Sequence, residues 1–434
     1  MSRPLAVICL AAGMGTRTKV TMPKVLLPLC GHTLVGAALA AVAELEPERV
    51  VVVLHNQRER VQATLERDHA DTFDSLTFVD QGAPQGTGHA VRAGMEPLRD
   101  FDGDVVVIYG DCPLMTAGTL ADLRALRGDA ACSALTAFPE DPTGLGRILR
   151  DDAGDFVGIR EQKDCTPEEA DIEEVNCGFY CFDAAKLRPA LASLKPNNAQ
   201  GEYYLTDVVA DFVEQGETLP TLEAEDLAEV QGVNSLVELA IVRAVMQERI
   251  LLEHLTNGVL IVDPAATWID ADVEIGRDTV ILPGSVIGAG CKIGEGCEVG
   301  PFAHLRGGTV MADGAAVGNY VEAKKAHLGP GAKAKHLTYL GDAAVGADAN
   351  IGCGTITANY DGVNKHRTVI GDRAFIGSGT VLCAPATVGA DAMTAAGSIV
   401  KPGTDIQAGA LWLGVPARYL KQRELPSEKG EQDT

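Results

Sequence analysis

Basic residues are scarce in this chain of 434 residues, which has 36 Lys and Arg against 60 Asp and Glu and a formal net charge of −24 at pH 7. A strongly negative surface without a basic patch repels nucleic acids and anionic membranes, so we expect neither as a partner. An anionic substrate must then be bound by a few locally placed Arg and Lys side chains. The charge balance therefore directs attention to individual basic residues.

Cysteine pairs at metal-binding spacing are also lacking. None of the 11 Cys residues forms a C-x2-C pair, and we interpret them as reduced, packed thiols. Arg3 and Leu5–Ala12 faintly resemble a signal peptide, but the same residues open a glycine-rich loop and no polar cleavage region follows. We therefore expect a cytoplasmic protein.

A long uninterrupted hydrophobic run is lacking as well. Val25–Ala43 contains no Asp, Glu, Lys or Arg, but Pro28, Gly31 and His32 break it. This segment predicts a loop followed by a buried helix, and no membrane insertion is expected.

A period of six residues runs through the last third of the chain. Such a period fits neither an α-helix nor a flat strand, but it fits a coil with three short faces, each of which points one aliphatic side chain inward. The pattern predicts a parallel β-helix of hexapeptide repeats. The residues that keep the period are Ile269, Ile275, Ile281, Ile287, Ile293, Val299, Leu305, Met311 and Val317, and five of them precede a Gly.

The first half of the chain alternates short aliphatic runs with amphipathic stretches, as in a doubly wound α/β sheet. Ligands of such sheets bind at the carboxyl ends of the strands. The expected strands are Leu5–Leu10, Val50–Leu54, Leu76–Val79, Asp104–Tyr109 and Ala131–Thr136, and the expected helices are Leu34–Glu44, Gln57–Arg67 and Thr119–Leu126.

Apolar residues recur at three to four positions through residues 235–256, which predicts one long helix that ends near Asn257-Gly258. We therefore divide the chain into an α/β domain (1–230), a linker helix (231–258), a β-helix domain (259–424) and a disordered tail (425–434).

A glycine-rich loop follows the first expected strand. It contains Leu10, Ala11, Ala12 and Gly13, and its small residues allow backbone N–H groups to approach phosphate oxygens. On this evidence alone, a tight strand-to-helix turn remains an alternative. Further residues suited to a nucleotide site are Arg17, Lys24, Gln81, Gly86, Thr87, Tyr109, Gly110 and Asp111, the last following a buried strand at the edge where a carboxylate can hold a metal.

Together these residues resemble the sugar-phosphate nucleotidyltransferases, and more closely the bifunctional N-acetylglucosamine-1-phosphate uridyltransferase/glucosamine-1-phosphate acetyltransferase family. The resemblance implies that Asp111 and Asn234 hold Mg²⁺ and that Gln81 and Gly86-Thr87 read the uracil of UTP. It also implies that Gly146, Glu161 and Asn176 hold the amino sugar, while Arg17 and Lys24 neutralise charge during uridylyl transfer. Further matching segments are Pro142–Arg147, Lys163, Gly201–Asp207 and Gly232–Asn234.

The six-residue period slips after Val317. The period returns one residue early at Leu328, Ala334 and Leu340. It returns earlier by one more residue at Val345 and Ile351. No clean repeat is visible between Ile351 and Ile370. Insertions in a solenoid leave it as loops, which are often its binding surface. The polar residues that gather around these slips are Lys324, His336, Tyr339, Asn350, Asn359, Tyr360 and Lys365.

A lone His in a β-helix is more often a surface residue, but the stretch 334–342 resembles the acetyltransferase half of the same family. The resemblance implies that His336 is the base for acetyl transfer from acetyl-CoA, since imidazole can accept a proton near neutral pH. It implies that Arg306 and Lys324 bind the sugar phosphate and that Tyr339 and Asn350 contact the sugar. The implied acetyl-CoA residues are Cys353, Asn359, Tyr360, Ser378 and Ala396.

Three features depart from the family. The start of the β-helix is about one coil short, position 353 is Cys instead of the frequent Ala, and the segment Leu411–Pro416 lacks an Arg that family members place against coenzyme A phosphates. Arg418 and Lys421 lie nearby in the sequence. The resemblance further implies left-handed coils and a homotrimer with acetyl sites between subunits.

Three alternatives remain open at this point. The β-helix could serve only to assemble trimers of a uridyltransferase. The chain could be a non-enzymatic scaffold, although the phosphate loop and Asp111 oppose this reading. The substrates could be another sugar phosphate or dTTP.

Overall fold

The computed structural model describes residues 3–70, 72–73, 76–196 and 200–422. The chain divides into two compact units, Met1–Val245 and Met246–Thr434. The boundary lies inside one helix, α8 (Leu236–Thr256), which spans the stretch predicted as a long helix. The tail predicted for 425–434 lies outside the described residues.

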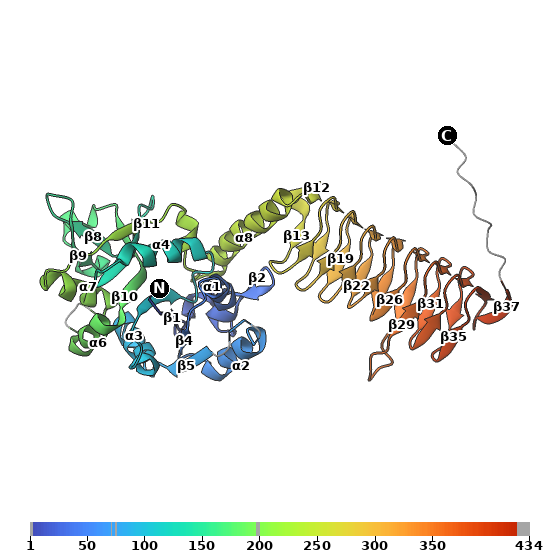
Figure 1. Cartoon of the computed structure of the whole chain (residues 1–434), viewed down its shortest axis with the longest axis horizontal. Helices are drawn as coiled ribbons and strands as arrows, with labels where there is room; N and C mark the ends of the chain where they lie inside the picture. Colours follow the sequence, from blue (N-terminus) through green and yellow to red (C-terminus); the bar gives the residue numbers. More distant parts are fainter. Residues whose placement is uncertain (1–2, 71, 74–75, 197–199, 423–434) are drawn as a thin grey trace. The chain divides into compact units, whose positions relative to one another are not determined.

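The first unit is an α/β fold around a mostly parallel sheet with the strand order β11-β7-β10-β6-β1-β4-β5 (Figure 1). Strands β1, β4, β5 and β6 run parallel, and β10 inserts antiparallel between β6 and β7. The strands are β1 (Leu5–Leu10), β4 (Arg49–Leu54), β5 (Leu76–Asp80), β6 (Asp104–Tyr109), β7 (Cys132–Ala137), β10 (Val175–Asp183) and β11 (Thr221–Glu223), with the hairpins β2 (Pro28–Leu29)–β3 (His32–Thr33) and β8 (Arg147–Arg150)–β9 (Phe156–Arg160).

Alternation along the buried strands builds a core on each face of this sheet. In β1, Ala6 and Ile8 face one core and Val7 and Cys9 face the other. Helices α3, α6 and α7 cover the first face, and α1, α2 and α4 cover the second. The helices are α1 (Leu34–Ala43), α2 (Arg58–Asp68), α3 (Thr87–Met95), α4 (Ala117–Arg127), α5 (Pro167–Ala170), α6 (Ala184–Ser193) and α7 (Leu205–Glu214).

The five predicted strands and three predicted helices of this unit are present, with ends shifted by at most two residues. Helices α3, α6 and α7 were not predicted, because their apolar positions are interrupted by Gly or Pro or are flanked by polar loops, and the four-residue α5 was not predicted either. The carboxyl ends of β1 and β6 meet where Leu10 pairs with Tyr109. The predicted phosphate loop and Asp111 therefore leave the sheet at the same edge.

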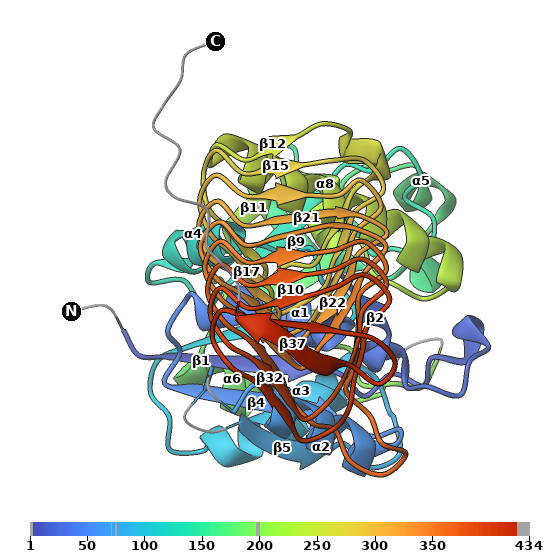
Figure 2. The same ribbon diagram turned by 90° about the vertical axis from the view of Figure 1, so that its right-hand side faces the viewer.

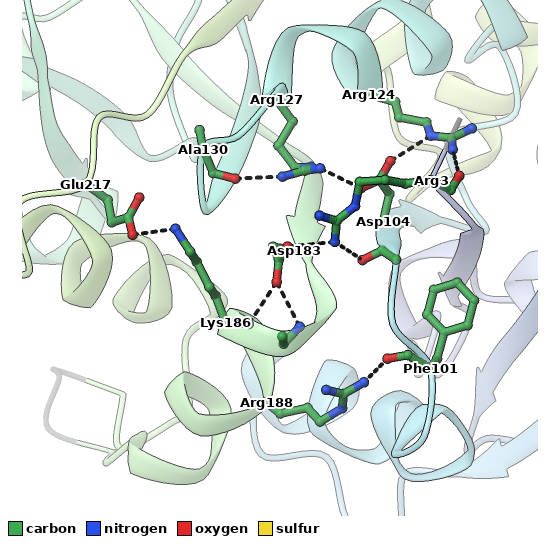
Figure 3. Close-up of polar contacts among 12 residues, drawn as sticks. Arg3, Phe101, Asp104, Arg124, Arg127, Ala130, Asp183, Lys186, Arg188 and Glu217 are labelled. Atoms are coloured by element: carbon green, nitrogen blue, oxygen red, sulfur yellow. Dashed lines mark hydrogen bonds and ion pairs between the residues drawn. The ribbon is translucent and has the colours of Figure 1, made fainter. Parts of the chain in front are cut away.

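A charged network closes the opposite edge of the sheet (Figure 3). Asp104 at the start of β6 is 4% exposed and accepts from Arg124 at 2.9 Å and from Arg127 at 2.6 Å. Arg3 binds both Asp104 and Asp183, which caps α6. Because buried carboxylates require partners, this network has a structural role at the amino ends of the strands.

The second unit is a parallel β-helix built from three ladders (Figures 1 and 2). The first ladder is β12 (Leu260–Ile261), β15 (Val280–Ile281), β18 (Glu298–Val299), β21 (Ala316–Asn319), β24 (Lys333–His336), β27 (Asn350–Ile351), β30 (Phe375–Ile376), β33 (Met393–Thr394), β36 (Ala410–Leu413) and the antiparallel β37 (Arg418–Gln422).

The other two ladders contain parallel pairs throughout. The second ladder is β13 (Trp268–Ile269), β16 (Val286–Ile287), β19 (His304–Arg306), β22 (Glu322–Lys324), β25 (Tyr339–Gly341), β28 (Ile356–Ala358), β31 (Val381–Cys383) and β34 (Ile399–Val400). The third ladder is β14 (Glu274–Ile275), β17 (Lys292–Ile293), β20 (Val310–Met311), β23 (His327–Leu328), β26 (Ala343–Val345), β29 (Thr368–Ile370), β32 (Ala386–Val388) and β35 (Thr404–Ile406).

The periodic aliphatic residues point inward as predicted. Eight of the nine are buried, and Ile275 in the first coil is partly exposed. Two details of the prediction were wrong. Ala323 keeps the six-residue frame and is fully buried, so the slip begins after it. The repeat also continues past Ile351, because Thr357 in β28 is fully buried and its hydroxyl accepts from the Gly341 N–H at 2.7 Å.

The insertion is therefore confined to the segment between β28 and β29. Tyr360 and Lys365 form an isolated bridge there, so the segment folds back on itself as a short hairpin. Val363 at its tip is 82% exposed. None of the helices in the described part of the chain combines the length and the hydrophobicity of a membrane span.

Candidate functional site

A cavity of about 420 Å³ lies at the carboxyl edge of the sheet in the first unit. The loop after β1, the segment after β5 and the end of β6 form its walls. Ten residues that the sequence predicted for the nucleotide line it: Leu10, Ala11, Ala12, Gly13, Lys24, Gln81, Gly86, Thr87, Tyr109 and Asp111. Gly110, which was also predicted, does not line this cavity or the second cavity described below. Its N–H donates to the Leu10 carbonyl instead.

The loop after β1 is fixed by its backbone. The Ala11 N–H donates to the Val53 carbonyl at 2.9 Å, and Gly15 has a φ of 63°. A Cβ at Gly15 would lie 2.8 Å from Cβ of Lys24, so a larger residue would displace Lys24. Arg17 lies in a 3-10 helix (Thr16–Thr18), is exposed and lines neither cavity.

Lys24 brings the two predicted metal ligands together. Its ammonium binds Asp111 Oδ2 and lies 3.0 Å from Asn234 Oδ1. The Lys24 side chain is 8% exposed and that of Asp111 is 20% exposed. A carboxylate oxygen and an amide oxygen thus converge on one cationic position, and such a donor set fits Mg²⁺, which takes its other ligands from phosphates and water.

A second cavity of about 320 Å³ adjoins the first, because Thr87, Tyr109 and Glu161 line both. The residues predicted for the sugar, Gly146, Glu161 and Asn176, line the second cavity together with the predicted metal ligand Asn234. Asn234 therefore reaches both the sugar cavity and the Lys24 ammonium.

One carboxylate, Glu161, lines the second cavity, and its charge acts on another, Asp207, which lies outside the lining. Burial raises the pKa of the Glu161 carboxyl, which accepts from the Thr206 hydroxyl at 3.2 Å. Burial, followed by the nearby charge of Asp211, raises the pKa of Asp207 to about 6. Asn176 Oδ1 accepts from Gly178 N and Tyr180 Oη, so its amide group is held in one orientation.

Gln81 is also oriented by its neighbours. Its amide nitrogen donates to the Gly86 carbonyl at 3.2 Å and lies 3.4 Å from His89 Nδ1. The Gln81 amide oxygen can then accept a hydrogen bond from a base edge. Gly86 has a φ of 105°, and a Cβ there would lie 2.5 Å from the Tyr203 carbonyl oxygen.

In the second unit, four predicted acetyl-site residues form a line along one edge of the β-helix. We call it the His336 edge; it is the corner between the first and second ladders and contains Asn319, His336, Cys353, Ser378 and Ala396. Asn319 pairs directly with His336. Hydrogen bonds from Gly379 N to the Cys353 carbonyl and from Gly397 N to the Ser378 carbonyl continue the column.

The character of this edge changes at His336. In the coil of His336 and the two coils before it, the corner residue with a left-handed backbone is bulky and exposed. These residues are Phe302, Tyr320 and Leu337. The three coils after it have Gly354, Gly379 and Gly397 with φ of 76°, 70° and 72°. Since Cys353, Ser378 and Ala396 are also small, the edge beyond His336 offers a smooth track for an extended ligand.

The predicted phosphate-binding residues meet at the next corner, between the second and third ladders. Arg306 pairs with Lys324 in the ladder, and Arg306 donates to Glu322 at 2.9 Å. The approach of Lys365 from the insertion lowers the pKa of the Lys324 ammonium. Three cations gathered on one corner favour an anion.

The remaining predicted residues are distributed as follows. Asn359 is 7% exposed and donates to Asp342, whereas Tyr360 is 59% exposed and donates to the Gly362 carbonyl at 2.5 Å. Tyr339 begins β25 in the second ladder, whereas Asn350 begins β27 in the first. Asn350 thus lies on a different face from Lys324.

Sequence reasoning missed Asn319, whose amide oxygen lies 3.1 Å from His336 Nδ1. It also missed the side-chain contact of Thr206 with Glu161 and that of Asp342 with Asn359. For Asn319 a signal was present, because it precedes His336 by 17 residues, which is one coil.

Comparison with known proteins matches a family model to a part of each unit. The family model of MobA-like NTP transferase domains matches residues 7–208, and that of bacterial transferase hexapeptide repeats matches residues 272–307. The hexapeptide match agrees with the parallel β-helix predicted from the six-residue period and with the left-handed coils that the family resemblance implies.

Curated relatives cover nearly the whole chain. A bifunctional protein GlmU from Pelobacter propionicus is 42% identical over 94% of this chain and 95% of its own length. Others, from Shouchella clausii and Mycobacterium bovis, are 43% and 41% identical over 94% and 98% of this chain, and over 96% and 94% of their own lengths.

Proposed function

This chain belongs to the family of the bifunctional GlmU proteins, and we propose that its residues carry out two successive steps of UDP-N-acetylglucosamine synthesis at two separate sites. The chain is a nucleotidyltransferase and an acetyltransferase. In the proposed order, the second unit acetylates glucosamine-1-phosphate with acetyl-CoA. The first unit then transfers uridylyl from UTP to N-acetylglucosamine-1-phosphate.

The observation that carries the nucleotidyl site is the contact of Lys24 with Asp111 and Asn234 where the two cavities adjoin. We assign UTP to the first cavity and the sugar phosphate to the second. An oxygen of the sugar phosphate attacks the α-phosphorus of UTP, and pyrophosphate leaves. Lys24 and the backbone N–H groups of Ala12 and Gly13 stabilise the phosphate charge. Mg²⁺ held by Asp111 and Asn234 would neutralise the charge between the phosphates.

Recognition of the two substrates follows from the fixed amides. Gln81, held by Gly86 and His89, would accept from the N3–H of uracil. Asn176 and Glu161 would bind hydroxyl and amide groups of the sugar. Arg17 lies outside both cavities, so we assign it to the leaving pyrophosphate and expect its loop to move on UTP binding.

The acetyl site uses the His336 edge and the cationic corner beside it. An amine must be neutral to attack a thioester, so His336 would take the proton that the amine loses. The new C–N bond would replace the C–S bond of the thioester, and coenzyme A would leave as its thiol. Arg306, Lys324 and Lys365 would bind the phosphate of glucosamine-1-phosphate. The thin pantetheine arm of coenzyme A would follow the track of Gly354, Gly379 and Gly397, and the thioester would then reach His336. Arg418 and Lys421 on β37 are exposed and would meet the coenzyme A phosphates.

We also propose that the protein is a homotrimer. Phe302 and Tyr320 are stacked with ring centres 5.5 Å apart and are 53% and 58% exposed. Both have a left-handed backbone, with φ of 53° and 54°, which bulky residues rarely adopt. A second copy covering this edge would bury these two exposed rings. Light scattering should give three chain masses, and a single chain mass would contradict the trimer.

We place the protein in the cytoplasm, where the two proposed co-substrates, UTP and acetyl-CoA, are found. The experiment that tests the function supplies the purified chain with each substrate pair separately and identifies the products by mass. We expect N-acetylglucosamine-1-phosphate from one pair and UDP-N-acetylglucosamine from the other, the latter only with Mg²⁺. Uridylyl transfer without acetylation would instead support a β-helix that only assembles the trimer. dTTP and other sugar phosphates are compared in the same assay.

A further inference from the structure

Asn319 and His336 occupy the same position on successive coils. β21 and β24 pair in parallel, and Asn319 is the direct partner of His336 at the end of the two strands. Neighbouring strands of a ladder lie about 4.8 Å apart, so both side chains leave the edge one rung from each other. The backbone continues this registration, because the Leu337 N–H donates to the Asn319 carbonyl at 3.0 Å.

The two side chains are in contact through specific atoms. Asn319 Oδ1 lies 3.1 Å from His336 Nδ1. An amide oxygen can only accept, so Nδ1 must carry the hydrogen in this contact. The neutral imidazole then has its lone pair on Nε2, on the side of the ring away from Asn319.

The surrounding backbone leaves little freedom at either residue. The Thr338 hydroxyl donates to the His336 carbonyl at 2.7 Å, which fixes the corner that follows the imidazole. A Cβ at Gly318 would lie 1.8 Å from the Lys335 carbonyl oxygen. The close approach of the two coils beside Asn319 therefore requires glycine at position 318.

The charged groups beside this edge are already bound to other partners. Glu322 accepts from Arg306 at 2.9 Å, and Glu298 accepts from Lys335 at 2.7 Å. On the next coil, Cys353 follows His336 in the column. A neutral amide is thus the group that orients the imidazole.

From this geometry we infer that Asn319 is a positioning residue for acetyl transfer, which holds His336 in the tautomer that presents Nε2 to the substrate amine. The inference rests on the proposed role of His336 as the base. It goes beyond that role because it assigns the tautomer and the residue that sets it. Asn319 itself touches neither substrate.

The test compares Asn319→Ala, Asn319→Asp and His336→Ala in the full-length chain, with uridylyl transfer as an internal measure of folding. Asn319→Ala should lower the kcat of acetyl transfer by about 10- to 100-fold, by analogy with the loss on removing a partner that orients a metal-bound His. KM for glucosamine-1-phosphate and acetyl-CoA should change by less than about threefold, since binding groups stay in place. Uridylyl transfer should be unchanged.

Asn319→Asp keeps an acceptor for Nδ1–H and should recover part of the lost kcat. Its negative charge should also favour the protonated imidazole, so the acidic limb of the kcat/KM profile should move to higher pH. A purely structural role for Asn319 would predict no such movement. Gln407→Ala removes an exposed amide from the last coils and serves as the matched control.

The outcomes separate the two claims. If His336→Ala retains acetylation, the proposed base is wrong and the role of Asn319 is wrong with it. If His336→Ala is inactive but Asn319→Ala keeps the full kcat, only the positioning role is overturned. If Asn319→Ala loses both reactions, the residue is structural and the inference is also overturned.

Discussion

The ammonium nitrogen of Lys24 lies 3.0 Å from the amide oxygen of Asn234, although 210 residues separate the two in the sequence. The same ammonium binds the carboxylate of Asp111. The fold thus gathers a Lys from the loop after β1, an Asp that follows β6 and an Asn that precedes α8. These three residues support the assignment of phosphate chemistry to the first unit.

Removing the carboxylate of this group should affect one reaction only. In Asp111→Ala, kcat for uridylyl transfer should fall by at least about 100-fold, because charge stabilisation at the phosphates is lost. Asn234→Ala should raise the Mg²⁺ concentration that gives half-maximal rate. Steady-state rates across a Mg²⁺ titration measure both effects. Uridylyl transfer at the wild-type rate in Asp111→Ala would contradict the assignment of Asp111 as a metal ligand. Acetylation by the same sample shows that the variant is folded.

Bulky residues on the His336 edge should obstruct coenzyme A. Ser378→Trp or Ala396→Trp should raise KM for acetyl-CoA by about tenfold or more, because the glycine track beside these exposed residues would be filled. KM for glucosamine-1-phosphate should change little. Ala408→Trp, on another edge of the β-helix, is the control. Unchanged acetyl-CoA kinetics in both edge variants would show that the coenzyme lies elsewhere.

The first unit should gain stability when Asp207 loses its charge. Burial raises the pKa of Asp207 to about 6, so the folded state binds the proton more tightly than the unfolded state does. The stability of the wild type should therefore fall as pH rises from about 4 to about 6, and it should stay lower above that window. At pH 7.5, Asp207→Asn should raise the free energy of unfolding by about 1–2 kcal/mol, after a discount for solvent screening, and the urea midpoint should rise with it.

The difference between Asp207→Asn and wild type should vanish near pH 4. Helical ellipticity follows the first unit, since nearly all helices of the described residues lie there. Asp102→Asn, at an exposed carboxylate of the same unit, serves as the control. A stabilisation that persists unchanged at pH 4 would rule out the electrostatic explanation.

The start of the β-helix depends on one amide. Gln247 in α8 donates to the Ile269 carbonyl at 2.6 Å and accepts from the Ile269 N–H at 3.2 Å, as a neighbouring strand would. Gln247 is 7% exposed, so Gln247→Ala would leave two buried backbone groups without partners and cost about 2 kcal/mol. Fluorescence of Trp268 and Trp412, the only tryptophans of the chain, follows this unit. An unchanged urea midpoint, equal to that of Gln407→Ala, would contradict this role.

Much of the fold could be predicted because it depends on the local spacing of apolar residues in the sequence. The six-residue spacing identified the inward residues from Ile269 to Val317, and aliphatic runs identified β1, β4 and β6. The prediction missed the repeat at Thr357 because the inward residue there is polar. Its hydroxyl forms hydrogen bonds with the Gly341 backbone inside the coil. Hydrophobicity alone does not detect such a position.

The sites were predicted as sets of residues but not as contacts. The resemblance named His336 and Asp111, yet neither the Asn319 contact nor the bridging by Lys24 follows from a motif. Both contacts depend on which strands become neighbours. Arg17 shows the opposite limit, since it belongs to the motif but lies outside both cavities.

The most direct test of two independent sites is a complementation measurement with glucosamine-1-phosphate, acetyl-CoA, UTP and Mg²⁺. His336→Ala alone should leave glucosamine-1-phosphate unconsumed but convert supplied N-acetylglucosamine-1-phosphate to UDP-N-acetylglucosamine. Asp111→Ala alone should accumulate N-acetylglucosamine-1-phosphate. The two variants mixed should form UDP-N-acetylglucosamine, identified by mass. Failure of the mixture, or loss of both reactions in either variant, would contradict a two-site enzyme.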